Sequence, residues 1–185
     1  MKSEELKQSI SIDGMTKEDA IVYLMKCYGE EIKRLVYTFV KNWQHAEDIT
    51  QEVYLSLYTK LDTFRGDSSV RSWIYTIAIN KSKDFLKSWS YRKLAFTDKF
   101  TINQKESAHS VEEGMISKNE DQLLYTAVLS LPLKYREVIL LHYYKEFSVR
   151  EICELLSMNE STVKTRLSRA RKVLQNHYIQ LGGER

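Results

Sequence analysis

Between residues 17 and 88, apolar residues recur three and four positions apart, the spacing that gives a helix one buried face. Thr16 and Asp19 form a capping box ahead of the first helical stretch, and Gly29 is expected to break or kink the chain soon afterwards. The stretches predicted to be helical are "KEDAIVYLMKCYG", "EEIKRLVYTFVKN", "HAEDITQEVYLSLYTKL" and residues 70–88. The positions predicted to face inward are Ala20, Ile21, Leu24, Tyr28, Ile32, Leu35, Val36, Phe39, Ile49, Val53, Leu57, Leu61, Ile74, Ile77, Ala78 and Phe85.

A second group of helical patterns begins at about residue 120. It predicts helices in "DQLLYTAVLSL", "KYREVILLHYYK", "VREICELL" and "ESTVKTRLSRARKVLQNHYIQL". Pro132 suits the first turn of one helix, and Ser148 suits the N-cap of another. The chain thus carries two separate sets of amphipathic helices.

The residues between these two sets, 98–118, are polar and lack apolar periodicity, as a linker does. The chain also has only one Pro and six Gly among its 185 residues, a composition with few helix breakers. We therefore expect an all-α protein with two small helical domains, residues 1–97 and 119–185, joined by a flexible linker.

The last two predicted helices are separated by only Ser157, Met158 and Asn159, which is typical of a helix-turn-helix. Many such turns contain Gly. Asn159 keeps the turn possible here because Asn tolerates a left-handed conformation better than most residues. Cys153 is expected to be the small residue that lets the two helices approach each other.

The last helix has two different faces. One is an apolar stripe of Val163, Leu167, Ala170 and Leu174. The other gathers hydroxyl and basic side chains, which can read base edges in a major groove and hold phosphates. Its members are Ser161, Thr165, Ser168, Arg169 and Lys172, with Thr162 and Arg166 on the flank. From these residues alone, a solvated basic face remains the alternative.

The helical stretch after residue 45 carries acidic and amide groups on one side. Asp48, Gln51 and Glu52 lie together there without interleaved cations. Such a face suits docking on a basic partner surface, although a merely solvated face is the simpler alternative.

The segment "FRGDSSVRSWIYTIAIN" combines a polar loop with flanking aromatic and basic residues. Beyond it, basic residues alternate with aromatic ones, which suits single-stranded nucleic acid because cations follow the backbone while rings stack on unpaired bases. The loop and Phe64 could hold a base taken out of the duplex, and Asn80 could bond a base edge. Packing in the core is the competing interpretation for Trp73.

The totals exclude several classes of function. The net charge of +3 is mild, so a polyanion partner must be inferred from where the charges lie. Cys27 and Cys153 are expected to be buried free thiols, and no spacing of Cys and His predicts a metal site or any other cofactor. The scattered histidines and the lack of a glycine-rich phosphate loop argue against an enzyme or a small-molecule substrate. No signal core or membrane-spanning run occurs, so we expect a cytoplasmic protein.

In order and content, these segments resemble the sigma-70 family of bacterial transcription initiation factors, in its compact extracytoplasmic-function (ECF, group 4) branch. "AEDITQEVYLSLYTKLDTFRG" with "VRSWIYTIAINKSKDFLK" resembles region 2 of that family. "LSLPLKYREVILLHYYKEFSVREICELLSMNESTVKTRLSRARKVL" resembles region 4. Together the segments and their flanks cover residues 18–176, nearly the whole chain.

The resemblance implies a role for each cluster of residues. Asp48, Gln51 and Glu52 would dock on the β′ clamp helices of core RNA polymerase, and region 4 would meet the β flap. The −10 element of promoter DNA would be held by Phe64, Arg65, Ser69, Arg71, Ser72, Trp73, Asn80, Lys83 and Lys87. The −35 element would be bound by Arg150, Ser161, Thr162, Lys164, Thr165, Arg166, Ser168, Arg169 and Arg171. An anti-sigma factor, often membrane-bound in this family, would hold the protein inactive.

Two other functions fit part of the pattern. A dimeric helix-turn-helix regulator of double-stranded DNA explains the last helix, but it leaves the acidic and aromatic-basic segments unexplained. An interaction module, with basic faces that meet acidic proteins, would bind no DNA even with polymerase present.

Overall fold

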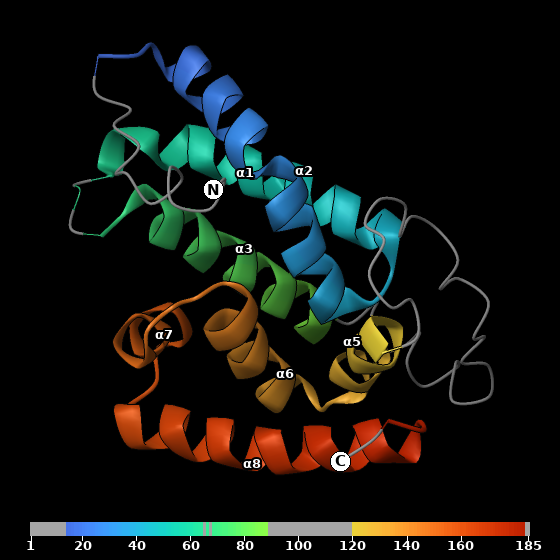
Figure 1. Ribbon diagram of the computed structural model, residues 1–185. Coiled ribbons are helices and arrows are strands. Elements are labelled where there is room, and N and C mark those ends of the chain that lie inside the picture. The colour runs from blue at the N-terminus through green and yellow to red at the C-terminus, as the bar shows by residue number, and fades with distance from the viewer. Residues whose placement is uncertain (1–13, 65, 67, 89–119, 184–185) are drawn as a thin grey trace. The chain divides into compact units, whose positions relative to one another are not determined.

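The computed structural model describes residues 14–64, 66, 68–88 and 120–183. Within these ranges every regular element is helical, which confirms the all-α prediction (Figure 1). The elements are α1 Lys17–Val40, α2 Trp43–Lys60, the 3-10 turn η2 Leu61–Thr63, α3 Val70–Lys87, α5 Glu120–Ser130, α6 Leu133–Ile139, the π-helical turn η4 Leu140–Tyr144, α7 Val149–Leu156 and α8 Glu160–Gln180.

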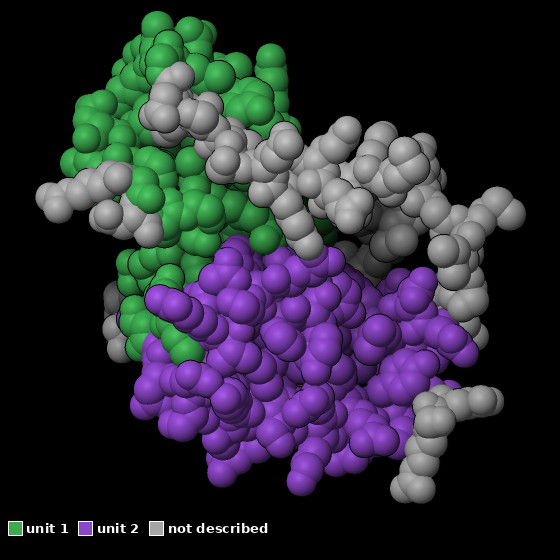
Figure 2. Space-filling model, turned by 60° about the vertical axis from the view of Figure 1, so that its left-hand side comes forward, with its two compact units in different colours: residues 1–86, 153–157 green, residues 87–152, 158–185 purple. Residues whose placement is uncertain are grey.

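The chain forms two compact units (Figure 2). Met1–Leu86 and Cys153–Ser157 belong to the first, and Lys87–Ile152 and Met158–Arg185 belong to the second. The predicted linker, 98–118, and both predicted domain boundaries beside it lie outside the described residues.

The expected break at Gly29 is wrong, because α1 runs through it as a single helix of 24 residues. The buried stripe explains the continuity, since Tyr28 and Ile32 on either side of the glycine are both buried. A glycine inside a helix costs only about 1 kcal/mol relative to alanine, less than the burial of the following apolar turns supplies. A Cβ atom at position 29 would lie 3.9 Å from the Tyr54 hydroxyl oxygen of α2, an ordinary contact distance.

Helices α1 and α2 form an antiparallel hairpin with a short connection. Lys41 ends α1 in the left-handed region, at φ 56°, and its N–H donates to the Tyr37 carbonyl. Asn42 caps α2 by accepting from the His45 N–H at 2.9 Å. The rings of Tyr37 and Trp43 stack across the connection with centroids 4.0 Å apart. Local capping therefore fixes where the chain reverses.

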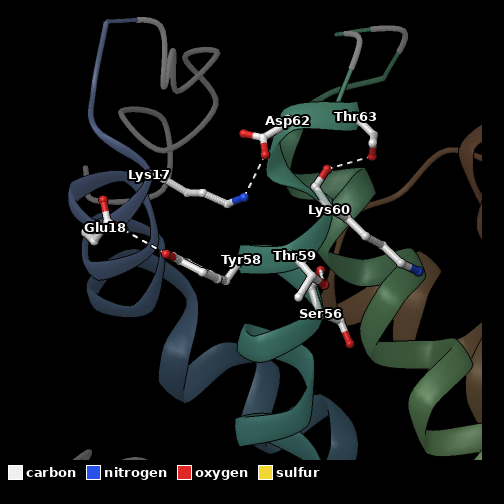
Figure 3. Close-up of polar contacts among 8 residues, drawn as sticks. All are labelled: Lys17, Glu18, Ser56, Tyr58, Thr59, Lys60, Asp62 and Thr63. Carbon is white, nitrogen blue, oxygen red and sulfur yellow. Dashed lines mark hydrogen bonds and ion pairs between the residues drawn. The ribbon is translucent and has the colours of Figure 1, made fainter.

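The open end of this hairpin is closed by polar contacts between the start of α1 and the end of α2 (Figure 3). Lys17 Nζ lies 2.7 Å from Asp62 Oδ2 and 4.9 Å from the centroid of the Tyr58 ring. The Tyr58 hydroxyl donates to Glu18 Oε1 at 2.8 Å, and this bond lowers the pKa of Glu18. These contacts, which we call the hairpin clasp, hold η2 immediately ahead of Phe64.

The third helix of the first unit is tied to α1 by a partly buried polar contact. Tyr75 is fully buried and its hydroxyl donates to Glu31 Oε1. Burial raises the pKa of Tyr75, so the phenol keeps its proton and remains a donor. Arg71 Nη2 approaches the same carboxylate at 3.4 Å, and its guanidinium lies over the Tyr75 ring. The contact fixes α3 against α1 along the helix axis.

Most predicted inward positions of the first unit are buried, and the exceptions lie at the ends of helices. Leu61 and Phe85 are only half-buried. Phe85 packs instead on His45, with ring centroids 4.9 Å apart. The buried set, with the positions that the pattern did not predict, is Ala20, Ile21, Leu24, Tyr28, Ile32, Leu35, Val36, Phe39, Val40, Ala46, Ile49, Val53, Tyr54, Leu57, Val70, Ile74, Tyr75, Ile77, Ala78 and Ile79.

In the second unit, α5 and α6 pack on α8. Pro132 occupies the N-cap of α6, one position before the first turn. Ser148 was correctly predicted as the cap of the next helix. Its N–H and hydroxyl donate to Glu151 Oε2 at 2.8 and 2.7 Å, and its Oγ accepts from the Glu151 N–H at 3.3 Å. The chain then runs through α7 toward α8.

The turn between α7 and α8 differs from the prediction in one respect. Ser157, not Asn159, adopts the left-handed conformation, at φ 52°. Asn159 has extended backbone and caps α8, since its Oδ1 accepts from the Thr162 N–H at 2.8 Å. Asn is among the best N-cap residues, so capping competes successfully with its tolerance of left-handed backbone.

We expect Gly29→Ala to stabilise the protein by about 0.5–1 kcal/mol, because the helix is continuous there and the new methyl group meets only an ordinary contact. Urea unfolding followed by circular dichroism measures the change. A lower unfolding midpoint than that of the wild type would show that α1 needs a kink at Gly29.

Two matched Tyr→Phe substitutions test the buried contact against the exposed one. Tyr75→Phe removes a partly buried hydrogen bond from a buried phenol to a carboxylate, which is worth about 1.5–3 kcal/mol. Tyr58→Phe removes a hydrogen bond from α2 to a carboxylate of α1, Glu18, at the surface. We expect a much smaller loss of stability from this change. Urea unfolding of both variants compares them. Equal losses would contradict the assignment of Tyr75 as the tie between α1 and α3.

Candidate nucleic-acid interface

The predicted acidic face is present on α2. Asp48, Gln51 and Glu52 are all exposed along one side of the helix. Glu52 is also paired, because Lys81 Nζ of α3 lies 3.3 Å from its Oε2. Leu55, one turn further along α2, is 66% exposed. The face therefore offers carboxylate and amide groups beside a large apolar side chain, a mixture that suits a protein partner.

Sequence reasoning missed both Lys81 and Leu55 on this face. Lys81 is 29 residues from Glu52, and only the packing of α3 on α2 brings them together. Leu55 could have been found, because it falls between the buried positions Val53 and Leu57 and thus off the apolar stripe.

Two packed rings flank the loop before α3, one ahead of it and one in the first turn of α3. Phe64 and Trp73 are both half-buried, with ring centroids 4.8 Å apart and planes inclined by 35°. The Phe64 N–H donates to the Leu61 carbonyl, so the end of η2 fixes the backbone from which the Phe64 ring projects. Because the hairpin clasp holds η2 (Figure 3), the position of the ring pair depends on α1 as well.

The serine residues of this loop cap the helix that follows. Ser69 Oγ accepts from the Ser72 N–H at 3.1 Å and donates to Ser72 Oγ at 2.9 Å. Gly66 has a φ of 74°, which favours glycine at the tip of the loop. Arg65, predicted to bind DNA, lies outside the described residues.

The predicted DNA-binding residues of α3 are not equivalent. Asn80 and Lys87 are exposed, and Lys83 is half-buried. Arg71 lies in the contact with Glu31 and Tyr75, so its guanidinium already has a partner inside the unit. Sequence spacing could not reveal this, since Glu31 is 40 residues away on another helix.

The second unit presents a broad polar surface on α8. Most of the predicted residues are exposed, as is Arg150 on α7. The exposed members are Ser161, Lys164, Thr165, Ser168, Arg169 and Arg171, together with Lys172. Within this surface, Lys164 pairs with Glu160 at 2.5 Å and lowers the pKa of that carboxyl. The arrangement can place hydroxyl and guanidinium groups against a nucleic-acid groove.

Thr162 and Arg166, the two flanking residues, differ from this exposed set. Thr162 is half-buried, and its N–H is used in the cap of α8. Arg166 Nη1 donates to Glu137 Oε1 at 2.7 Å, and Glu137 is only 3% exposed. The sequence pattern placed Arg166 on the flank of this surface, and the family resemblance assigned it to the −35 element; neither revealed Glu137.

Neither a metal centre nor a membrane helix is found in the part of the chain that the structure describes. No group of three or more His, Cys, Asp or Glu residues there is arranged to hold a metal ion. None of the helices in those ranges is both long and apolar enough to cross a bilayer. Cys27 and Cys153 are free thiols, although both are only half-buried rather than fully buried as expected.

Family models match the two halves of the chain separately. Residues 24–90 match sigma-70 region 2, and residues 121–174 match sigma-70 region 4. The first match covers most of α1 together with α2 and α3, and the second covers α5, α6, α7 and most of α8.

Whole-length relatives show the same similarity. The chain is 32% identical over 165 residues to the ECF RNA polymerase sigma factor SigW of Bacillus subtilis, covering 85% of this chain and 88% of that one. It is 29% identical over 183 residues to the ECF RNA polymerase sigma-E factor of Escherichia coli, covering 94% and 95%.

Solved structures agree at the level of the fold. The sigma factor RpoE of Bartonella quintana, solved in complex with the anti-sigma factor NepR, matches with a TM-score of 0.68 at 20% identity, over 90% of this chain and 99% of that one. CnrH in complex with the cytosolic domain of CnrY matches with a TM-score of 0.59, also at 20% identity, over 86% and 87%. With both regions matched in order and relatives aligned over most of their length, the chain belongs to the sigma-70 family, in its extracytoplasmic-function group.

Proposed function

We propose that this chain is an alternative sigma factor, which binds core RNA polymerase and directs it to promoters through their −10 and −35 elements. The observation that carries the proposal is the presence of both family regions, in order, on two helical units with different polar surfaces. Polymerase is a cytoplasmic enzyme, so the protein acts in the cytoplasm. Its contribution to initiation is binding and DNA melting, without catalytic chemistry of its own.

The first unit makes the polymerase contact in this proposal. Asp48, Gln51 and Glu52 dock on the clamp helices of the β′ subunit, and the second unit meets the β flap. The exposure of all three residues supports this contact, as does the exposed Leu55 beside them. Lys81 holds the Glu52 carboxylate toward one edge of the face.

The Phe64–Trp73 ring pair at the start of α3 recognises the melted −10 strand. Phe64, Trp73 and the loop between them take up a base displaced from the duplex. Ser69 and Ser72 hold the loop through the helix cap, while Arg65 acts from the loop itself. Further along the strand, Asn80, Lys83 and Lys87 contact bases and phosphates. Arg71 would have to leave Glu31 to reach DNA, so we assign it to holding α3.

The second unit binds the −35 element as a duplex. Ser161, Thr165 and Arg169 lie on the exposed side of α8 and read base edges in the major groove. Thr162 holds the start of α8 through the cap. The remaining exposed residues position the helix on the phosphates; they are Arg150, Lys164, Ser168 and Arg171.

An anti-sigma factor regulates the protein in this proposal. Two proteins of similar fold were solved with such a protein or a cytosolic domain bound, namely the RpoE–NepR and CnrH–CnrY complexes. We infer that a comparable partner holds this chain inactive and that release from it allows polymerase binding.

Lysine substitutions on α2 test the polymerase contact. Run-off transcription with core polymerase should start at selected promoters only when the wild-type protein is added. Asp48→Lys and Gln51→Lys should each lower that signal at least about tenfold, because a cation facing a basic surface costs more than about 1.4 kcal/mol.

Glu30→Lys is the control matched in charge to Asp48→Lys, since it also replaces a carboxylate with a cation, on an exposed position of α1. It should leave transcription nearly unchanged. If no promoter responds to the wild-type protein while the protein alone binds duplex DNA tightly, a dimeric regulator would replace the sigma factor. Equal losses in all three variants would contradict the α2 contact.

Removal of the Phe64 ring tests the base-capture role. Phe64→Ala should reduce DNA melting, seen as permanganate reactivity of unpaired thymines, by about tenfold, because one stacked base is worth about 1–3 kcal/mol. Tyr23→Ala removes an exposed ring from α1 and should leave melting unchanged. Normal melting by a folded Phe64→Ala protein would contradict the pocket.

A further inference from the structure

Arg166 differs from the other basic residues of α8 in where its charge is neutralised. Its side chain is 27% exposed, whereas the Lys164 side chain, two residues earlier, is 65% exposed. Its Nη1 atom donates to Glu137 Oε1 at 2.7 Å. Glu137 comes from α6 and is 3% exposed, so the contact lies at the packed junction of two helices.

The geometry of the helix separates Arg166 from the exposed surface of α8. Val163, Leu167 and Ala170 are buried and define the inward direction. At about 100° per residue, Arg166 lies roughly 60° from that direction and roughly 120° from the middle of the outward face. Ser161, Thr165 and Lys172 cluster around that outward middle, so Arg166 belongs to the inner side.

Exchange of Glu137 for DNA would be unfavourable for Arg166. A carboxylate withdrawn from water is stable only with a countercharge or hydrogen-bond donors. If the guanidinium turned to a base edge, it would remove the 2.7 Å donor from a carboxylate that water hardly reaches. Lys164 faces no such cost, because the side chain of its partner Glu160 is 63% exposed.

The neighbouring residue anchors α6 in turn. Arg136 is also buried, and its Nη1 donates to the carbonyls of Leu129 and Leu131 at 2.6 and 3.2 Å. Arg136 thus ties α6 to the end of α5, while Glu137 ties α6 to α8. Helix α8 is therefore fixed to the rest of the second unit through two successive residues of α6.

We propose that Arg166 is a positioning residue and that Glu137 is its partner. The pair sets the rotation and the axial position at which α8 presents Ser161, Thr165 and Arg169 to the −35 element. Arg166 itself reads no base. This inference rests on the proposed function and deepens it, because it separates the basic residues of α8 that contact DNA from Arg166, which positions the helix.

The test uses full-length protein in holoenzyme, with promoters that carry each of the four bases at each −35 position. Arg166→Met keeps an apolar stem but removes the charge. It should weaken binding to every promoter by the same factor and leave the base preferences unchanged. Arg169→Met is the matched control on the exposed side, and it should flatten the preference at one or two positions. A flattened position with Arg166→Met would overturn the proposal.

A second comparison tests the pair itself. Glu137→Gln should also weaken binding uniformly, although its buried side chain is placed against α8 and not at the surface. The double variant should lose no more promoter affinity than Arg166→Met alone, because either change breaks the same ion pair. Additive losses would overturn the pairing.

A conservative variant covers the case in which Arg166→Met does not fold, as judged by circular dichroism. Arg166→Lys keeps a cation for Glu137 but cannot make the two-pronged contact by which arginine reads guanine. It should retain the wild-type base preferences, and loss of preference at one position would overturn the proposal. If wild-type holoenzyme itself shows no −35 preference, the proposed function fails, a result distinct from every outcome above.

Discussion

Each unit depends on one carboxylate held between helices, where an apolar stripe alone would leave the helices free to rotate or slide. In the first unit, Tyr75 and Arg71 of α3 meet Glu31 of α1. In the second, Arg166 of α8 meets Glu137 of α6. Apolar contacts are non-directional, whereas a charged hydrogen bond fixes distance and angle. The Phe64–Trp73 ring pair at the start of α3 and the outward face of α8 both derive their positions from these two contacts.

This arrangement explains why residues of the same type have different roles on one helix. Arg71 lies beside the half-buried Glu31 and Arg166 beside the buried Glu137, and their charges serve the fold. Arg169 is exposed and faces outward from α8. A surface that must bind a polyanion needs cations that are not already neutralised. A helix that must be presented at a fixed angle needs other cations that are neutralised by partners within the protein. Both demands are met within a few residues.

Periodicity and capping were enough to predict the helices, because both act over three or four residues. Thr16 and Ser148 cap where their side chains indicated. The same local reasoning failed at Gly29, where burial on both sides outweighs a weak helix preference. It placed Arg166 on the flank of the α8 surface but could not reveal its partner, because Glu137 is 29 residues away and meets it only after α6 and α8 pack. The residues assigned to DNA bases and to polymerase remain predictions in both units.

The central claim is that this chain gives core polymerase its choice of promoter. The most direct measurement is transcription of whole genomic DNA from the source organism by core polymerase, with and without the protein, followed by sequencing of the RNA 5′ ends. We expect a set of new start sites that share one sequence near −10 and a second near −35. Start sites identical to those of core polymerase alone, or new ones without any shared upstream sequence, would contradict it.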